Sequence, residues 1–315
     1  MLFINHIFMN KLDMHFHSTC SDGKNTHEEI LDQAKKKGLE FIALTDHDHI
    51  SGNFQQKAQE KWIISTQSVE ISARNYQHEK SLHITCYAKE FSQDVFDILD
   101  WVRERRKNNL QVQIESLQKS GFKISIEDFQ HAADEMKRPI EAMNKFDIAR
   151  ILYENPKNKK IWVCLNNWVD IWLVQFYLQY FKRNGEKFST FWILVPEYEP
   201  SLEICKQIKE KNNAILSMAH PNFTFKNDMQ TFVHTIEHYV HTAWLNAVEI
   251  NSRATDEWIE VIQQVAEKYW LFITFWSDNH GIWIKDEKHA DFGNLNPNVT
   301  EEFIEQEFEK YREMM

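Results

Sequence analysis

Near the start of the chain, apolar and polar residues are spaced as expected of a strand, a helix and a second strand. Residues 41–45, FIALT, are a short apolar run bounded by polar residues, which is typical of a buried parallel strand. Residues 27–37 before it have apolar positions at helical spacing. A capping box opened by Thr26 starts this predicted helix, and Gly38 ends it. The pattern therefore predicts a strand-helix-strand unit.

The rhythm of strands and helices continues along the chain, with one interruption. Strands are expected at 63–71 and 82–88, and helices alternate with strands again from residue 201. Between them, a long amphipathic helix and further short, aromatic-rich helices predict a mostly helical insertion that covers the site. The fold class is α/β, and we expect a barrel at 9–95 and 196–295, the helical insertion at 96–195 and an acidic C-terminal helix at 296–315.

Side chains that can bind metal ions stand at the ends of the predicted strands. Asp13, His15 and His17 occupy alternate positions of an extended segment, so they are expected to share one face. A lone histidine is more often an ordinary core or surface residue, but two tight clusters at equivalent strand ends are hard to obtain that way. The carboxyl ends of neighbouring strands are where α/β folds place their chemistry. The collected residues are His15, His17, Asp22, His47, Glu70, His83, His220, Asp278 and His280.

This mixture of imidazoles and carboxylates suits manganese, iron or zinc. Nine such side chains exceed what one tetrahedral ion needs, so we expect two or three divalent ions, with manganese preferred. A cluster of this kind lowers the pKa of bound water and neutralises the charge that develops on a phosphoryl group.

The composition of the chain limits the kinds of molecule that it can be expected to bind. The formal net charge of −11 argues against a protein that holds duplex DNA by bulk charge, but it leaves a small anionic substrate open. The 4 cysteines have no Cys-x-x-Cys spacing, which favours a reducing cytoplasm. The first residues have neither a basic leader nor a long apolar run, so no membrane segment is expected there. Nothing in the sequence indicates the oligomeric state.

A run of cations lies in the long helix of the predicted insertion. Arg103 shares a helical face with Arg106 and Lys107, because residues three and four apart are neighbours on a helix. The ordinary interpretation is a solvated basic face. The functional alternative is a clamp for phosphate, whose oxygens pair well with such side chains.

The motifs DMHFHSTCSDG, ALTDHDHISG, VEIS, MAHP and SDNHG occur in this order, together with His83. The sequence therefore resembles the PHP (polymerase and histidinol phosphatase) superfamily over roughly residues 9–293. The resemblance implies a distorted seven-stranded (β/α) barrel with a trinuclear site. It also implies that the nine residues are the metal ligands, with Glu70 bridging two ions. Asp22, His47 and His280 are the implied catalytic residues, and Asp22 and His280 assist proton transfer.

Within the superfamily, the sequence looks most like the branch that hydrolyses nucleoside 3′,5′-bisphosphates and short RNA ends. The resemblance implies that Arg103 and Arg106 bind substrate phosphate. Lys145 stands where relatives have a second phosphate-binding arginine, and lysine loses the two-pronged geometry. Ser68 also replaces a usual glycine. The alternatives are a histidinol-phosphate phosphatase and a non-catalytic metal-binding module. The expected partner is a small phosphorylated nucleotide or short RNA, without duplex DNA or membrane.

Tryptophan and glycine have unusual counts. Glycine occurs 7 times and tryptophan 11 times, whereas average usage of about 7% would give roughly 22 glycines. We hypothesise that the gene reads UGA as glycine and was translated here with UGA as tryptophan; genuine tryptophan enrichment is the alternative. At position 276, glycine would let backbone approach the metal cluster that an indole crowds. The positions where glycine is expected are Trp62, Trp168, Trp244, Trp270, Trp276 and Trp283.

Overall fold

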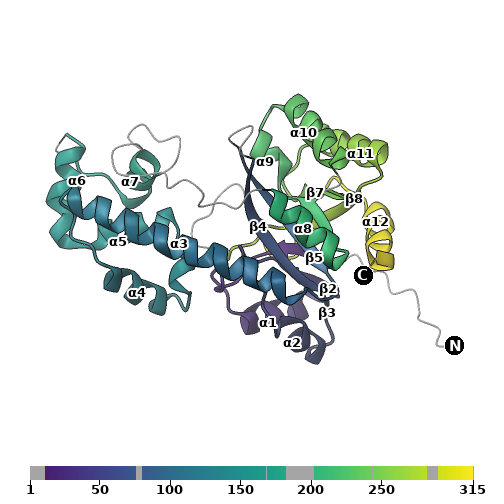
Figure 1. Cartoon of the computed structure of the whole chain (residues 1–315), viewed down its shortest axis with the longest axis horizontal. Coiled ribbons are helices and arrows are strands. Elements are labelled where there is room, and N and C mark those ends of the chain that lie inside the picture. Colours follow the sequence, from purple (N-terminus) through teal and green to yellow (C-terminus); the bar gives the residue numbers. More distant parts are fainter. Residues whose placement is uncertain are drawn as a thin grey trace. The chain divides into compact units, whose positions relative to one another are not determined.

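The computed structural model describes residues 11–75, 80–167, 169–181, 202–242, 245–281 and 290–314. The protein has a mixed α/β fold that divides into two compact units (Figure 1). The first, called the α/β unit, comprises Met1–Leu99 and Glu199–Met315. The second, called the helical unit, comprises Asp100–Tyr198.

The strands of the α/β unit form two sheets. The first sheet is parallel, with the order β1 (Leu12–Phe16), β2 (Phe41–Leu44) and β3 (Ile64–Ser65). The second sheet begins with two antiparallel pairs, β4–β5 and β5–β6, and continues with the parallel strands β6, β7 and β8. Its strands are β4 (Gln67–Asn75), β5 (Lys80–Ala88), β6 (Ile215–Met218), β7 (Ala247–Asn251) and β8 (Phe272–Trp276).

The arrangement differs from the seven-stranded barrel that the resemblance implies. The described residues form eight strands in two sheets, and neither sheet is closed. Two isolated parallel bridges connect the sheets. One joins Phe16, the last residue of β1, to Asn279 after β8, and the other joins His47 after β2 to Glu70 within β4. The antiparallel pairing of β4 and β5 interrupts the parallel repeat, because a parallel neighbour would need a crossover connection. The α/β class predicted from the sequence is confirmed, but a closed barrel is not.

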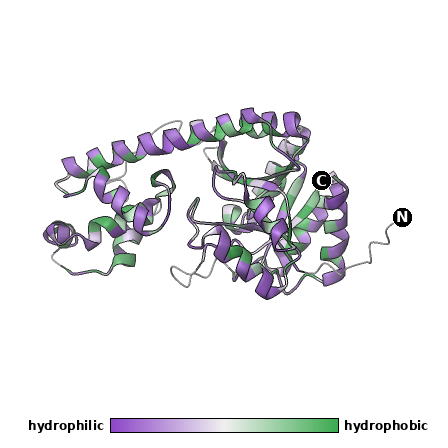
Figure 2. Cartoon of the chain, turned by 90° about the horizontal axis from the view of Figure 1, so that it is seen from below, coloured by the Kyte–Doolittle hydropathy of each residue, from purple (hydrophilic) through white to green (hydrophobic). Residues whose placement is uncertain are grey.

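Helices cover the sheets of the α/β unit. In α1 (His27–Lys37), the Thr26 side chain accepts from the Glu29 N–H and the Glu29 carboxylate accepts from the Thr26 N–H, as the capping box predicts. Helix α8 packs on β6, α11 packs on β7 and β8, and α12 packs on β8. Figure 2 shows hydrophilic and hydrophobic segments alternating along these helices, as expected of amphipathic elements. The helices are α2 (Phe54–Glu60), α8 (Glu203–Asn212), α9 (Pro221–Phe225), α10 (Met229–His241), α11 (Asp256–Tyr269) and α12 (Glu301–Met314).

The helical unit has its own core. Phe129, Leu152, Trp162 and Phe176 are buried in it. Helix α3 begins in the α/β unit and continues into this one. The α-helices are α3 (Gln93–Lys119), α4 (Ile126–Glu135), α5 (Lys145–Glu154), α6 (Lys159–Leu165) and α7 (Leu173–Tyr180). Among the helices in the described ranges, none is long and apolar enough to cross a membrane.

Two tryptophans occupy backbone positions that normally favour glycine. Trp62 follows α2 with φ of 66° and Trp270 follows α11 with φ of 56°, close to the 67° of Gly38 after α1. The next N–H after Trp270 binds the Ala266 carbonyl at 2.9 Å, a bond that commonly accompanies a glycine helix end. Both indoles are 92% exposed. These positions support the glycine hypothesis, whereas Trp168, Trp244 and Trp283 lie outside the described residues.

Candidate metal centre

All nine candidate metal ligands lie in the α/β unit, on or just after its strands. His15 belongs to β1, Glu70 to β4 and His83 to β5. The others follow strand ends, because a side chain just past a strand projects over the edge of the sheet. His17 and Asp22 follow β1, His47 follows β2, His220 follows β6, and Asp278 and His280 follow β8. The structure brings seven of the nine together in three overlapping groups, and His220 and Asp278 lie against them, next to Glu70 and His17 respectively.

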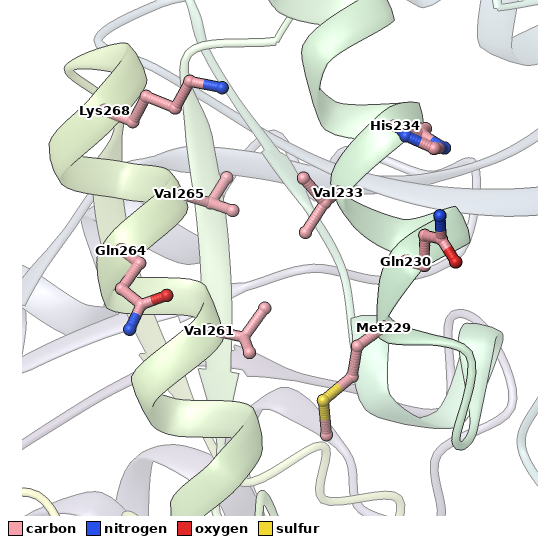
Figure 3. A pocket seen from close by; sticks show the side chains of 8 residues that line it. All are labelled: Met229, Gln230, Val233, His234, Val261, Gln264, Val265 and Lys268. Carbon is pink, nitrogen blue, oxygen red and sulfur yellow. The ribbon is translucent and has the colours of Figure 1, made fainter.

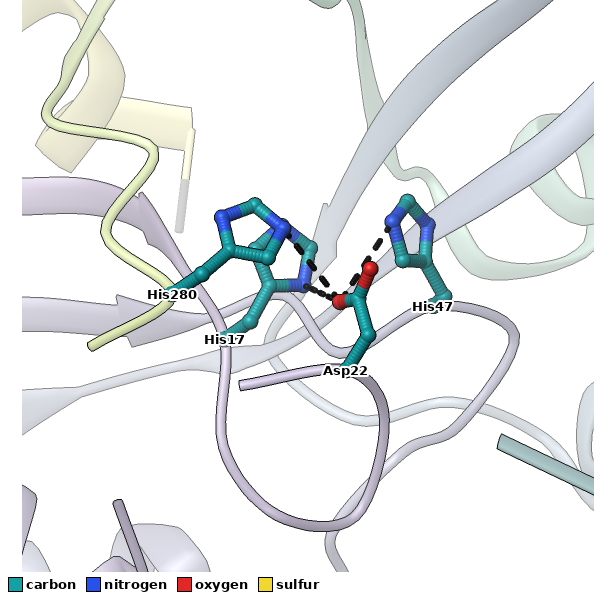
Figure 4. A group of neighbouring side chains, drawn as sticks. All are labelled: His17, Asp22, His47 and His280. Carbon is teal, nitrogen blue, oxygen red and sulfur yellow. Dashed lines mark ion pairs between the residues drawn. The ribbon is translucent and has the colours of Figure 1, made fainter. Parts of the chain in front are cut away.

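The first group surrounds the Asp22 carboxylate (Figure 4). Asp22 Oδ1 lies 3.3 Å from His280 Nε2, 3.8 Å from His47 Nε2 and 3.9 Å from His17 Nδ1. The four donor atoms of this group all lie within 4.8 Å of one another. Three imidazoles and one carboxylate at this separation form a set that suits one divalent ion.

Glu70 joins the other two groups, because its two oxygens face different histidines. Oε2 lies 3.3 Å from Nε2 of both His15 and His17 and 3.0 Å from His47 Nδ1. Oε1 lies 2.9 Å from His83 Nδ1 and 3.0 Å from His220 Nε2. The carboxylate is buried, and Oε2 has no hydrogen-bond partner among the described residues. A buried carboxylate oxygen ringed by imidazole nitrogens fits a bridging metal ligand.

Pairs of imidazole nitrogens face each other at short range. His15 Nε2 lies 3.2 Å from His17 Nε2, and His83 Nδ1 lies 3.2 Å from His220 Nε2. Two neutral imidazole lone pairs so close need a proton or a cation between them. The donor set therefore fits bound metal ions.

Asp278 and His220 have strained backbones. Their φ angles are 53° and 35°, in the left-handed region that is costly for residues with a Cβ. Asp278 Oδ1 lies 3.4 Å from His17 Nε2 and 3.7 Å from His15 Nε2. Such strain persists where the surrounding structure fixes the residue, and here it directs a carboxylate and an imidazole to the cluster.

The charge of the cluster shifts the pKa values of its members. Burial alone lowers the pKa of His280, but the carboxylates of Asp22 and Asp278 outweigh it and raise that pKa to about 10. Burial and the neighbouring His280 lower the pKa of His17 to about 4. Burial raises the pKa of Asp22, but the neighbouring His280 and His47 hold it well below its usual range. The carboxylates thus favour cations nearby, and His17 is a neutral donor.

Glu249 is part of this site, although it is not among the nine predicted residues. This fully buried carboxylate on β7 lies 3.1 Å from His15 Nδ1 through Oε1, and its Oε2 accepts the His220 N–H at 3.0 Å. Thr85 donates to Oε1 at 2.8 Å. A carboxylate on the far nitrogen of a ligating histidine fixes its tautomer and ring orientation. A charged residue within the apolar, strand-forming segment AVEI is the sequence feature that could have identified it.

The Asp13 carboxylate does not lie with the side chains of His15 and His17, contrary to the prediction that the three share one face. Its carboxylate accepts from Ser277 N at 3.1 Å, Ser277 Oγ at 2.5 Å and Gly293 N at 2.8 Å. Burial raises its pKa to about 6, although these hydrogen bonds oppose the rise. Asp13 therefore joins β1 to the segment after β8 and does not join the donor groups.

Trp276 forms a wall of the site. Its buried ring stacks on His15, with centroids 4.6 Å apart, and lies 5.8 Å from the ring of His220. The indole N–H has no hydrogen-bond partner among the described residues, which is unfavourable for a buried donor. The indole therefore lies directly against two candidate ligands, and glycine at this position stays a prediction.

The predicted phosphate-binding residues lie in the other unit. Arg103 on α3 forms ion pairs with Asp100, at 3.9 Å, and with Glu141. Arg106 also lies on α3, and Lys145 is the first residue of α5. Their role in binding substrate stays a prediction.

A separate surface pocket of about 350 Å³ lies between α10 and α11 (Figure 3). Apolar side chains such as Val233, Val261 and Val265 project into it, with His234 and Lys268 at its margin. Its lining contains none of the nine candidate ligands. This pocket therefore does not form part of the candidate metal centre.

Comparisons with curated proteins give short matches. The chain is 30% identical over 118 residues to phosphoribosyl 1,2-cyclic phosphate 1,2-diphosphodiesterase of Eggerthella lenta, covering 36% of this chain and 45% of that protein. It is 46% identical over 44 residues to the 3′,5′-nucleoside bisphosphate phosphatase of Chromobacterium violaceum, covering 14% of this chain and 15% of that protein. The chain thus spans less than half the length of each of these relatives.

Solved structures resemble the fold over nearly the whole chain. An amidohydrolase from Chromobacterium violaceum, with bound sulfate and no metal, has a TM-score of 0.68 at 20% identity, covering 91% of this chain and 92% of that one. A putative metal-dependent phosphoesterase from Bifidobacterium adolescentis has a TM-score of 0.63 at 19% identity, covering 93% and 95%. The PHP domain model matches residues 13–270, a span that contains seven of the nine candidate ligands; Asp278 and His280 follow it.

 A match over most of the chain, with these residues gathered in one place, shows that the chain belongs to the PHP domain family.

Proposed function

We propose that this protein removes phosphate from nucleoside 3′,5′-bisphosphates or from the 5′ ends of short RNA. It is a phosphoester hydrolase of the PHP type, and its chemistry depends on metal ions. The observation that carries the proposal is the set of three overlapping donor groups that meet at Glu70, His17 and His47. Because a phosphoryl group carries negative charge, a site built to gather cations suits its transfer.

The three groups suit three ions, or two if one group stays empty. Glu70 would bridge two of them, as its oxygens face separate histidines. Manganese is the preferred ion, with iron or zinc as alternatives for the same donors. The proposed ligands are the nine residues His15, His17, Asp22, His47, Glu70, His83, His220, Asp278 and His280.

When bound, the ions supply charge that neutralises the phosphoryl oxygens and makes water more acidic. The chain itself supplies proton transfer. Asp22 Oδ1 and His280 Nε2 lie 3.3 Å apart, so whichever of the two is not holding an ion would pass a proton to the leaving oxygen. His47 completes this group and orients Asp22 from the other side.

Substrate recognition is assigned to cations of the helical unit. Arg103 and Arg106 would bind the second phosphate of a bisphosphate, and Lys145 would add charge without two-pronged geometry. The bisphosphate phosphatase relative supports this substrate class. The compartment that we propose is a reducing cytoplasm, because the sequence has only 4 cysteines and no Cys-x-x-Cys spacing.

A second candidate is the hydrolysis of a cyclic phosphate. The match to the cyclic phosphate diphosphodiesterase covers 118 residues, more than the 44 of the bisphosphate phosphatase. Histidinol phosphate and a non-catalytic metal-binding role are the remaining alternatives.

The test is phosphate release in the presence of Mn²⁺. The substrates are adenosine 3′,5′-bisphosphate, phosphoribosyl 1,2-cyclic phosphate, histidinol phosphate and a generic phosphate monoester. Preference for the bisphosphate, lost in His47→Ala, is expected. Preference for another substrate keeps the site and overturns the substrate class. No turnover with metal bound favours the non-catalytic role.

A further inference from the structure

A fourth group of metal-binding side chains lies apart from the nine. Cys20 is in the turn after β1, His27 is the first residue of α1, and Asp46 follows β2. One ligand atom from each lies within 4.8 Å of the others. None of the three belongs to the donor groups described above, and Cys20 adds a thiol, which those groups lack.

The spacing of the thiol and the imidazole fits one tetrahedral ion. Cys20 Sγ lies 3.5 Å from His27 Nε2. Around zinc, a thiolate at about 2.3 Å and an imidazole at about 2.0 Å lie about 3.6 Å apart at a tetrahedral angle. The Ser51 hydroxyl lies 3.1 Å from the same nitrogen, so a further oxygen is close to the same point. Three elements thus direct donors to one place.

Hydrogen bonds fix the orientation of the Asp46 carboxylate, as is usual for a carboxylate that binds a metal ion. Its Oδ1 accepts from Ser18 N at 2.7 Å and from Ser21 Oγ at 2.5 Å. Its Oδ2 accepts from Ser18 Oγ at 2.6 Å, and a carboxylate oxygen has a second lone pair for an ion. Hydrogen bonds of this kind orient a ligand before the metal binds.

We propose that Cys20, His27 and Asp46 bind a single ion of the Zn²⁺ class, with water or the Ser51 hydroxyl as fourth ligand. The thiolate selects a softer ion than the nine oxygen and nitrogen donors do. Binding releases the thiol proton to solvent. The ion would tie together the two turns that carry Asp22 and His47, because Cys20 and Asp46 precede these residues by two positions and one.

The test uses the full chain, freed of metal and titrated with Co²⁺. A thiolate-to-cobalt charge-transfer band in the near ultraviolet is expected, since the other donor groups contain no thiol. The band should disappear in Cys20→Ser and in His27→Gln. It should remain in Cys164→Ser, which removes an exposed thiol of the helical unit, and in His47→Ala. No band in the unmodified chain, or a band that persists in Cys20→Ser, overturns the proposal.

A measurement on the unmodified chain guards against variants that fail to fold. Alkylation of each cysteine is followed by peptide mass spectrometry with and without Zn²⁺. At a Zn²⁺ concentration about ten times Kd, alkylation of Cys20 should slow about tenfold. The exposed Cys164 is the internal control and should react equally in both samples. Equal reaction of Cys20 with and without Zn²⁺ contradicts the proposed site.

Discussion

The two units treat buried charge in opposite ways. In the helical unit, Arg138 Nη1 lies 3.1 Å from Asp147 Oδ2, and this buried pair balances one cation against one anion. In the α/β unit, Glu70 has histidines on both oxygens, and His15 and His17 face each other at 3.2 Å. A balanced pair completes a fold by itself, whereas the cluster needs ions from outside. A buried charge with a single partner of opposite sign therefore indicates a structural role, whereas a cluster of histidines and carboxylates indicates a functional site.

The largest expected effect is a loss of activity when a histidine of the metal-binding cluster is removed. His47→Ala should lower kcat by about 10³-fold, because a bound metal supplies several kcal/mol of stabilisation to the transition state. The free energy of unfolding of the metal-free protein should stay the same or rise. Steady-state phosphate release and urea unfolding measure the two quantities. A large loss of stability with full activity would assign His47 to the fold instead.

Removing one partner of the Arg138–Asp147 pair should instead lower the stability of the protein. Arg138→Met leaves the Asp147 carboxylate buried without its cation, which costs about 3–5 kcal/mol of unfolding free energy. The double variant Arg138→Met, Asp147→Asn should recover most of that loss, since neither charge remains and the amide oxygen can still accept from the Asn144 N–H at the start of α5. Urea unfolding of the single and double variants checks both expectations. A double variant as unstable as the single one would show that the pair itself is not the cause.

Glu249 offers a smaller change in the cluster. Glu249→Gln keeps the shape but weakens the hold on the His15 ring, so metal affinity should fall about 10- to 100-fold. Titration with Mn²⁺ followed by calorimetry measures this affinity. The matched control is Glu237→Gln, a half-buried carboxylate on α10 that is not among the candidate ligands, which should leave metal affinity unchanged. Equal effects of the two variants would remove Glu249 from the site.

The smallest expected effect concerns the helix ends. Trp270→Gly should stabilise the protein by about 1 kcal/mol, because glycine adopts the left-handed conformation without steric cost. Thermal unfolding measures the change. Trp101→Gly, an exposed tryptophan inside helix α3, is the control and should destabilise by about 1 kcal/mol. Peptide mass spectrometry of the native protein that finds tryptophan at 270 would contradict the glycine hypothesis at that position.

Much of the site could be predicted because its residues follow a local rule. A strand end places its polar residues at the edge of a sheet, so His15, His47 and Asp278 could be grouped from the sequence alone. The position of the Asp13 carboxylate could not be predicted in this way. It depends on Ser277, which is 264 residues away, and no local pattern encodes that contact.

The α/β class also follows from local periodicity, but the pairing of strands does not. The predicted strand at 63–71 is divided into β3 and β4, which belong to different sheets. The apolar pattern marks a segment as a strand but does not identify its partner, so the pairing of β4 with β5 is not visible in it. A closed barrel can be predicted only when the neighbours of every strand are known.

The hydrogen bonds of Asp13 to Ser277 and Gly293 have a consequence for protein synthesis. Strand β1, which carries His15 and directly precedes His17, leaves the ribosome 264 residues before its partner Ser277. Since domains begin to fold while they are synthesised, this strand must wait for its final neighbours until the segment after β8 has been made. The complete cluster can therefore form, and hold metal ions tightly, only after that segment has been synthesised.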